Sequence, residues 1–188
     1  MALAILAIAA VSSAASAQDG TPRQPRFVAV DIPPPPPGPV LDEADIFPVA
    51  EEAALNARLR DTQAQTGVTL VVVTVNSLQG AEIGDFAFTL FNGWGIGRAA
   101  SHRGLLVLLA PNERVARIEV GCGLISVFSD QSTADIMQQR MLPKFREGNL
   151  PGGINAVVDA LTATLESKPS SLEPGPVAEH CGGPETAR

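Results

Sequence analysis

The sequence predicts an α/β protein, a three-layer sandwich in which a small mixed β-sheet is flanked by helices. Two continuous apolar runs, residues 68–75 and 104–110, are typical of strands buried on both faces. Between and after these runs, apolar residues recur at the spacing of amphipathic helices. Helices that cover such strands give a layered architecture. With 188 residues, 45% of them hydrophobic, the chain suits one compact domain with flexible ends.

The first helix is predicted over residues 48–66. Pro48 suits a first helical position, because an N–H group there would have no partner within the helix. Leu55 and Leu59 are four residues apart and share one helix face, and Gly67 is a typical helix terminator. The run at 68–75 follows as a central strand, and residues 77–80 turn the chain.

A second amphipathic helix is predicted over residues 83–91, with the Asn92-Gly93 pair as its cap. Its apolar positions recur at i, i+3, i+4, i+7 and i+8, which places them on one face. The second buried strand, residues 104–110, is followed by a turn at 111–114. Residues 115–120 then alternate between apolar and charged side chains, a pattern that predicts a strand with one solvated face.

Two further helices complete the predicted domain. The first covers residues 132–142 and is expected to stop at Pro143, because proline cannot continue the hydrogen-bond ladder of a helix. The second covers residues 151–166 and carries one apolar stripe of five residues, Ile154, Val157, Val158, Leu161 and Leu165. The domain is therefore predicted to span residues 40–166.

The N-terminus has the pattern of a signal peptide over residues 1–17. Residues 1–11 form an unbroken apolar run, and the small residues after it end in Ala15-Ser16-Ala17, an A-x-A cleavage site. The run is too short to span a membrane. We therefore expect export to the periplasm or secretion, with no transmembrane segment in the mature chain.

Two segments outside the domain lack the composition of a packed core. Residues 18–39 form a proline-rich linker, and the prolines at 33–37 favour a stiff polyproline II rod. Such a rod could dock on a proline-reading partner, but a spacer role is the preferred interpretation. Residues 167–188 are rich in Pro, Gly, Ser and Glu and are predicted to be a disordered tail.

Cys122 and Cys181 are the only cysteines. In an oxidising periplasm they could form a disulfide bond. Alternatively, Cys122 is a small buried hydrophobic residue and Cys181 a free thiol in the tail. The sequence leaves both alternatives open, and two cysteines with two distant histidines do not make a zinc site.

The charge balance argues against nucleic acid as a partner. The chain has 13 basic and 20 acidic residues, a formal net charge of −7, with no basic stripe. Tyrosine is absent and aromatic residues make up only 4%, so platforms for stacking bases are not expected. This charge balance fits a soluble protein that could hold a divalent cation.

Several stretches of the domain resemble the TPM domain family, the thylakoid-lumen acid-phosphatase-like domains. The most specific are Trp94-Gly-Ile-Gly97 and the later Val120-Gly-Cys-Gly123. The resemblance covers nearly all of residues 40–166, including 40–44, 66–80, 86–97, 104–110, 117–124 and 143–148. It implies export, the α/β sandwich and, as in some members, an acid phosphatase-like activity. Other members appear as metal-free interaction modules.

The resemblance also implies a group of carboxylates at one end of the sheet, where Ca²⁺ or Mg²⁺ can bind. Asp42 matches the first acid of this group and Asp130 the last, while Asp45 is a third candidate ligand. If the protein is an enzyme, Asp42 is the candidate catalytic residue, activating water beside the bound ion.

The chain departs from the family pattern at three of the expected positions. His102 and Arg103 stand where the family has an acidic pair, and Ile125 stands where it often has a glutamate. A guanidinium repels a metal cation. We therefore expect no tightly bound cofactor, and at most weak binding of Ca²⁺ or Mg²⁺.

Each candidate residue also has a structural interpretation. Asp42 and Asp45 could form a turn or cap before the first helix, and Asp130 could help to cap the helix that follows it. His102 could be a solvated loop residue. Arg103 could hold a phosphate bidentately, or replace the metal ion by pairing with Asp42 or Asp130, and we prefer the pairing.

Two functions remain in competition. The first is a non-catalytic module that helps to maintain or assemble complexes of the bacterial cell envelope, binding an envelope protein that the sequence does not identify. The alternative is a metal-dependent, acid phosphatase-like hydrolase. The loss of the acidic pair at residues 102 and 103 favours the binding module.

Cleavage by signal peptidase is expected between Ala17 and Gln18, because Ala15-Ser16-Ala17 is the small-x-small site directly after the apolar run. N-terminal sequencing of the exported protein measures this. An intact N-terminus in the periplasmic fraction would contradict the prediction.

Overall fold

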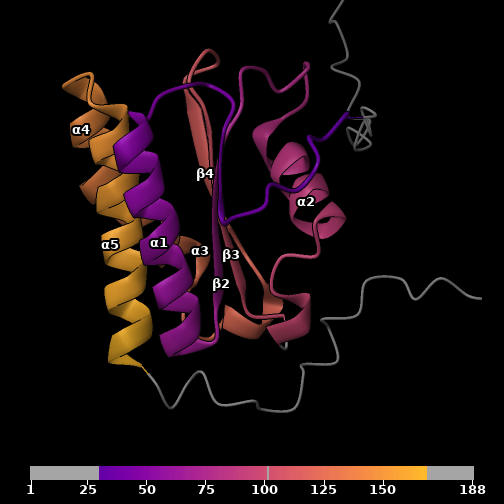
Figure 1. Ribbon diagram of the computed structural model, residues 1–188, viewed down its shortest axis with the longest axis vertical. Coiled ribbons are helices and arrows are strands. Elements are labelled where there is room, and N and C mark those ends of the chain that lie inside the picture. The colour runs from indigo at the N-terminus through magenta and orange to yellow at the C-terminus, as the bar shows by residue number, and fades with distance from the viewer. Residues whose placement is uncertain (1–29, 101, 169–188) are drawn as a thin grey trace, which may run out of the picture.

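The computed structural model describes residues 30–100 and 102–168 (Figure 1). The predicted signal peptide, the first part of the predicted linker, the tail beyond residue 168 and Cys181 lie outside these described residues. The expectations for those segments therefore stay predictions.

A four-stranded mixed sheet forms the centre of the domain, in the order β1-β2-β3-β4. β1 (Val40–Asp42), β2 (Thr69–Thr74) and β3 (Gly104–Ala110) run parallel, and β4 (Val115–Val120) is antiparallel to β3. The three parallel strands therefore end at one edge of the sheet, here called the carboxyl edge, which holds Asp42 and Thr74. The opposite amino edge holds the start of β3 and the end of β4.

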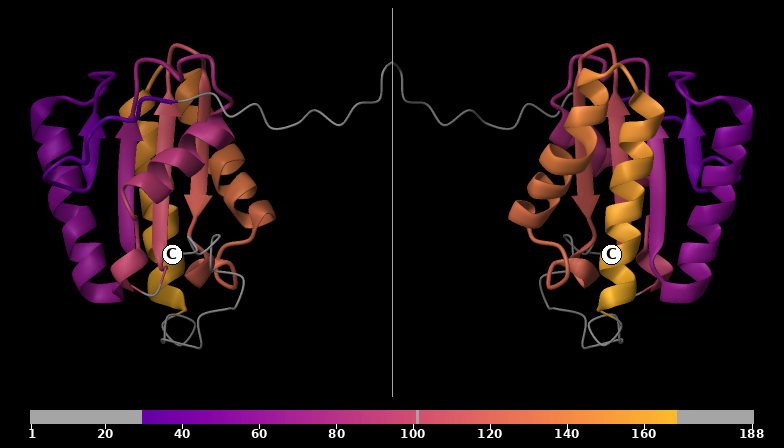
Figure 2. Two further views of the ribbon diagram at one scale, coloured as in Figure 1. Left: turned by 90° about the vertical axis from the view of Figure 1, so that its right-hand side faces the viewer. Right: turned by 90° about the vertical axis from the view of Figure 1, so that its left-hand side faces the viewer.

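Helices lie on both faces of the sheet, which confirms the predicted three-layer sandwich (Figures 1 and 2). α1 (Val49–Thr66) and α5 (Leu150–Ser167) cover one face, and α2 (Ile83–Gly93) covers the other. Each face has its own apolar core, because alternate residues of β2 and β3 point to opposite sides. Among the described helices, none combines the length and apolar character needed to cross a membrane.

The helix after β4 differs from the prediction at Pro143. We expected one helix over residues 132–142 that stops there. Instead, α3 (Asp130–Ile136) continues through a π-helical turn (Met137–Met141) into α4 (Leu142–Arg146), with Pro143 in the first turn of α4. The wider π-helical turn lets the N–H of Leu142 reach the carbonyl of Met137, five residues back. This shift of the hydrogen-bond ladder accommodates a residue that has no N–H to donate.

Residues 30–39, predicted as part of a spacer, lie against the domain instead. We call this segment the proline strap. Figure 1 shows it on the α2 side of the sheet before the chain enters β1. The indole N–H of Trp94 donates to the carbonyl oxygen of Pro33 at 2.8 Å, and Ile32 belongs to the same apolar cluster as α2. The folded unit therefore begins about ten residues before the predicted boundary.

Three glycines bring three backbone segments into direct contact at the amino edge. A Cβ atom on Gly97 would overlap the backbone of Arg103 and Gly104, and one on Gly121 would overlap the carbonyl oxygen of His102. A Cβ on Gly104 would lie 2.6 Å from the carbonyl oxygen of Ile96. The predicted tight turns at the two glycine motifs therefore exist because these backbones pack too closely for any side chain.

Gly121→Ala is expected to destabilise the domain by about 1–3 kcal/mol, because the added methyl group forces neighbouring backbones apart. Urea denaturation measures this as a lower midpoint at an unchanged slope. The matched control is Gly84→Ala near the start of α2, where a Cβ would make ordinary contacts at 3.7 Å and more. Equal midpoints for the two variants would contradict the proposed close packing.

Candidate functional site

Asp42, the strongest candidate from the sequence, ties the end of β1 to the neighbouring strand and to the start of α1. One carboxylate oxygen accepts a hydrogen bond from the Thr74 hydroxyl, and the other accepts from the N–H of Phe47 at 2.8 Å. Thr74 is fully buried at the end of β2, and its hydroxyl oxygen also accepts from the N–H of Ala44 at 3.1 Å. The Asp42 carboxylate therefore organises the β1–α1 turn.

Asp45 lies in the same turn and is exposed. Its backbone has a φ of 51°, a left-handed conformation that aspartate tolerates better than most residues. Its N–H points to the carbonyl oxygen of Asp42 at 3.4 Å. These contacts match the turn-forming interpretation of both residues. The sequence did not point to Thr74, whose hydroxyl is the hydrogen-bond partner of Asp42 at the end of an otherwise apolar strand.

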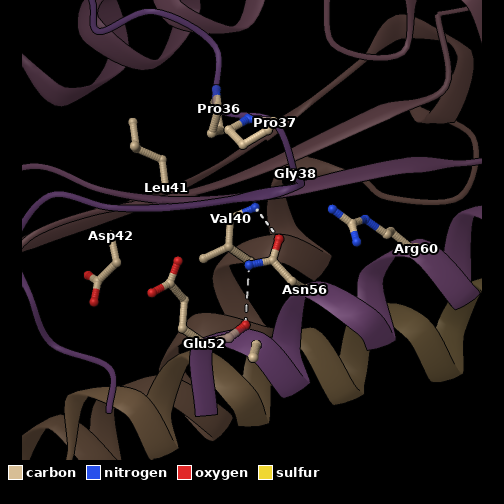
Figure 3. Close-up of a pocket in the computed structure, with 10 residues that line it drawn as sticks. Pro36, Pro37, Gly38, Val40, Leu41, Asp42, Glu52, Asn56 and Arg60 are labelled. Atoms are coloured by element: carbon tan, nitrogen blue, oxygen red, sulfur yellow. Dashed lines mark hydrogen bonds between the residues drawn. The ribbon is translucent and has the colours of Figure 1, made fainter. Parts of the chain in front are cut away.

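A cavity of about 530 Å³ opens beside Asp42, between the proline strap, β1 and α1. Figure 3 shows Asp42 and Glu52 at one end of it and Arg60 at the other. Asn56 lies between these ends, where its side chain accepts from the N–H of Val40 at 3.3 Å. The volume is in the range of small-molecule sites. Its two carboxylates and one guanidinium offer polar contacts of both signs.

The loop before β3 and the turn after β4 meet at the amino edge. The carbonyl oxygen of His102 accepts from the N–H of Gly123 at 3.1 Å, and His102 itself has a φ of 59°. Ile125 follows the short 3₁₀ turn Cys122–Leu124, and 58% of its surface is exposed. The structure thus brings together the two loops that the family resemblance pairs. Here, however, they carry histidine, arginine and isoleucine.

Cys122 begins this 3₁₀ turn and is disulfide-bonded. Cys181, with which the sequence analysis left pairing open, lies outside the described residues, so the identity of the partner stays open.

Arg103 lies beside the C-terminal end of α1. Its guanidinium is 3.4 Å from the position that a Cβ on Gly67 would occupy, and Gly67 is the left-handed C-cap of α1. The last turn of α1 contains no basic residue of its own. A cation at this place interacts favourably with the partial negative charge of the helix C-terminus. The contact gives Arg103 a structural role that does not involve Asp42.

Asp130 is the first residue of α3 and is exposed. The cap is supplied by its neighbour Ser129, whose hydroxyl oxygen accepts from the N–H of Ser132 at 3.2 Å. The sequence pointed to Asp130 as a cap and missed Ser129, although serine is among the preferred capping residues. A carboxylate in the first turn still interacts favourably with the helix dipole.

The predicted candidates do not form one group. Thr69 is in register with Gly104, and Thr74 with Leu109. The backbone of Arg103, one residue before Gly104, is therefore separated from that of Asp42 by about 20 Å along the strands. The expected pairing of Arg103 with Asp42 is not formed.

Asp130 follows the amino-edge turn, so it does not share an edge with Asp42 either. Within the described ranges, no three His, Cys, Asp or Glu side chains lie close enough to hold a metal ion together. The residues brought together at the amino edge, a histidine, an arginine and an isoleucine, do not fit the oxygen-rich shell that Ca²⁺ requires.

Comparisons with known proteins point to one family. A family model described as the TPM domain matches residues 40–164. The N-terminal domain of a protein from P. gingivalis, solved by NMR, is 33% identical with a TM-score of 0.66, over 72% of this chain and 87% of that domain. No curated protein matches the chain.

Two more distant solved structures share the fold. An N-terminal domain from Corynebacterium glutamicum is 20% identical with a TM-score of 0.53, over 81% of this chain and 93% of that one. A protein from the psychrophilic bacterium Bizionia argentinensis is 21% identical with a TM-score of 0.52, over 67% and 81%.

Asp42→Ala is expected to lower the free energy of unfolding by about 1–3 kcal/mol, because it leaves the buried Thr74 hydroxyl and the Phe47 amide without their acceptor. Urea denaturation measures the change. The matched control is Glu43→Ala, which removes the exposed neighbouring carboxylate and should stay within about 0.5 kcal/mol. A neutral Asp42→Ala would show that the carboxylate does not organise the turn.

Proposed function

The chain belongs to the TPM domain family, and on this premise we propose that it is a non-catalytic binding module that helps to maintain or assemble complexes of the bacterial cell envelope. The proposal includes export to the periplasm or secretion through the N-terminal signal peptide. It assigns the protein no tightly bound metal ion.

The observation that carries the proposal is the pair of hydrogen bonds that the Asp42 carboxylate accepts. Both of its oxygens accept hydrogen bonds that hold the β1–α1 turn, from the Thr74 hydroxyl and the Phe47 amide. A carboxylate that is engaged in this way is poorly placed to activate a water molecule as a general base, since its protonation would weaken the turn. The one candidate catalytic residue therefore has a structural role that explains its presence.

The residues at the amino edge support the same proposal. Replacing acids with Arg103 adds positive charge where a cation would bind, and it disfavours a hard-cation site. The exposed Ile125 adds apolar surface at the same edge of the sheet. Apolar side chains combined with arginine are more typical of protein interfaces than of metal sites.

The proposal predicts that Ca²⁺ binds weakly to the mature chain, and that binding appears when acids are restored at the amino edge. The variant combining His102→Asp, Arg103→Asp and Ile125→Glu should bind Ca²⁺ saturably, because the two loops already lie side by side. Isothermal titration calorimetry of residues 18–188 measures Ca²⁺ binding by the wild type and by this variant. Little heat at millimolar Ca²⁺ is expected for the wild type.

Two further variants in the restored background locate the site. Asp130→Ala should weaken the binding, since Asp130 follows the amino-edge turn, whereas Asp42→Ala should leave it unchanged. Saturable Ca²⁺ binding by the wild type, or hydrolysis of p-nitrophenyl phosphate that is stimulated by Mg²⁺ and lost in Asp42→Ala, would contradict the proposal and favour the hydrolase.

A further inference from the structure

The proline strap contacts the domain with one face only. Among its prolines, Pro33, Pro36 and Pro39 are partly buried, whereas Pro34, Pro35 and Pro37 are exposed. A polyproline II helix has three residues per turn, so positions i, i+3 and i+6 lie on the same side. Residues 37–39 bend toward β1, where the carbonyl oxygen of Pro39 accepts from the N–H of Val72, so the spacing that a polyproline II segment in a groove would show applies to Pro33 and Pro36.

Two side chains of the domain hold the backbone of the strap. The indole N–H of Trp94 donates to the carbonyl oxygen of Pro33 at 2.8 Å. The amide of Gln79 makes two bonds to Asp31: its oxygen accepts from the Asp31 N–H at 3.0 Å, and its nitrogen donates to the Asp31 carbonyl at 2.8 Å. Recognition of backbone groups suits a proline-rich ligand, because proline carbonyls have no intramolecular partner in this conformation.

Side-chain packing complements these bonds. The end of the Ile32 side chain lies against Gly93, where any Cβ atom would overlap it. Proline-reading domains combine an aromatic residue that donates a hydrogen bond with an apolar groove. Trp94, Gln79 and the surface at Gly93 supply these parts.

The prolines do not fill the groove. A cavity of about 350 Å³ remains between residues 35–39 of the strap and the turn that carries Trp94, with Gln63 and Arg60 also in its lining. A proline-rich ligand with bulkier side chains would therefore find additional contact area there.

We propose that Trp94, Gln79 and the surface around Gly93 form a proline-reading groove. The proline strap occupies it as an intramolecular ligand, and a proline-rich segment of another protein exchanges with it. This inference deepens the proposed binding-module function, on which it rests, by naming a surface and the class of partner. An intramolecular ligand on a short tether acts at an effective concentration of about millimolar, so an external segment binds well only when the strap is released.

The strap can be released by a substitution of the side chain that it packs against α2. Ile32→Asp removes an apolar contact with the groove at Gly93, and Pro34→Asp places the same charge at an exposed position of the strap as the matched control. Trp94 is the only tryptophan, so its fluorescence reports on the groove. The first variant should show red-shifted emission and stronger acrylamide quenching, and the control variant should match the wild type.

Adding the ligand back tests recognition directly. An acetylated peptide with the sequence of residues 30–39 should reverse the fluorescence change of the released variant and bind it at least about tenfold more tightly than the wild type. The same peptide with serine in place of all its prolines should not bind. Trp94→Phe in the released background should abolish peptide binding, measured by calorimetry.

Four results of the fluorescence and peptide experiments would overturn the inference. Trp94 fluorescence could be unchanged in the released variant, the control variant could show the same change, the peptide could fail to bind, or the serine peptide could bind equally. If circular dichroism shows the released variant to be unfolded, Ile32→Ala replaces it, since this change shortens the strap side chain that lies against Gly93 and leaves the groove residues unaltered. A wild-type dimer that dissociates on strap release would assign the groove to a second copy of the chain and also overturn the inference.

The tests of the groove and the tests of the proposed function can fail independently of each other. Failure of the peptide to bind, with neither saturable Ca²⁺ binding nor phosphatase activity in the wild type, would refute the groove alone. Metal-dependent hydrolysis together with peptide binding would refute the non-catalytic role and leave the groove in place.

Discussion

Close backbone packing at the amino edge of the sheet is the constraint on which the rest of the structure depends. Gly97, Gly104 and Gly121 bring the Trp94 turn, the start of β3 and the turn after β4 within a distance that no side chain permits. The position of Trp94 is thereby fixed relative to the sheet, and with it the point at which the proline strap is held. The same contact brings the His102 loop against Gly123 and defines the surface that carries Ile125.

The candidate residues at the two edges of the sheet have different structural roles. At the carboxyl edge, the bonds from Asp42 to Thr74 and Phe47 fix the path from β1 into α1. At the amino edge, Arg103 lies near the C-terminus of α1, and Ile125 faces solvent. An enzyme of the phosphatase type needs several oxygen ligands at one place. Separate roles for these residues support the proposed binding module.

Much of the fold could be predicted from local patterns. The strands at 104–110 and 115–120 and the helix that ends at Gly67 agree with the structure, because an apolar run, an alternation and a left-handed glycine are strong local signals. The path through Pro143 could not be predicted from the proline alone, since a π-helical turn relieves the missing donor. Contact between the strap and the domain depends on a surface that the fold creates from distant residues.

The distance between Asp42 and Arg103 has a different explanation. A helix between the first two strands and another between the second and third imply parallel connections, which put the ends of these strands at one edge. The loop before residue 104 must then lie at the other edge, away from Asp42. The sequence analysis predicted no strand at residues 40–42, so the position of Asp42 at the carboxyl edge did not follow from it, and the family resemblance alone placed Asp42 and Arg103 at one site. The roles of Thr74 and Ser129 could not be predicted from the sequence, because a single hydroxyl group gives little sequence signal.

The strap also determines the order in which the domain is completed. During synthesis the N-terminal segment emerges first, yet its hydrogen bonds are to Gln79 and Trp94, which lie 48 and 61 residues further along the chain. It has no partner until α2 has formed on the sheet. Contacts between residues so far apart in sequence have a high entropic cost of loop closure and form late. The first described residues of the domain therefore reach their folded position only after α2, and an engaged strap marks a domain in which α2 is already in place.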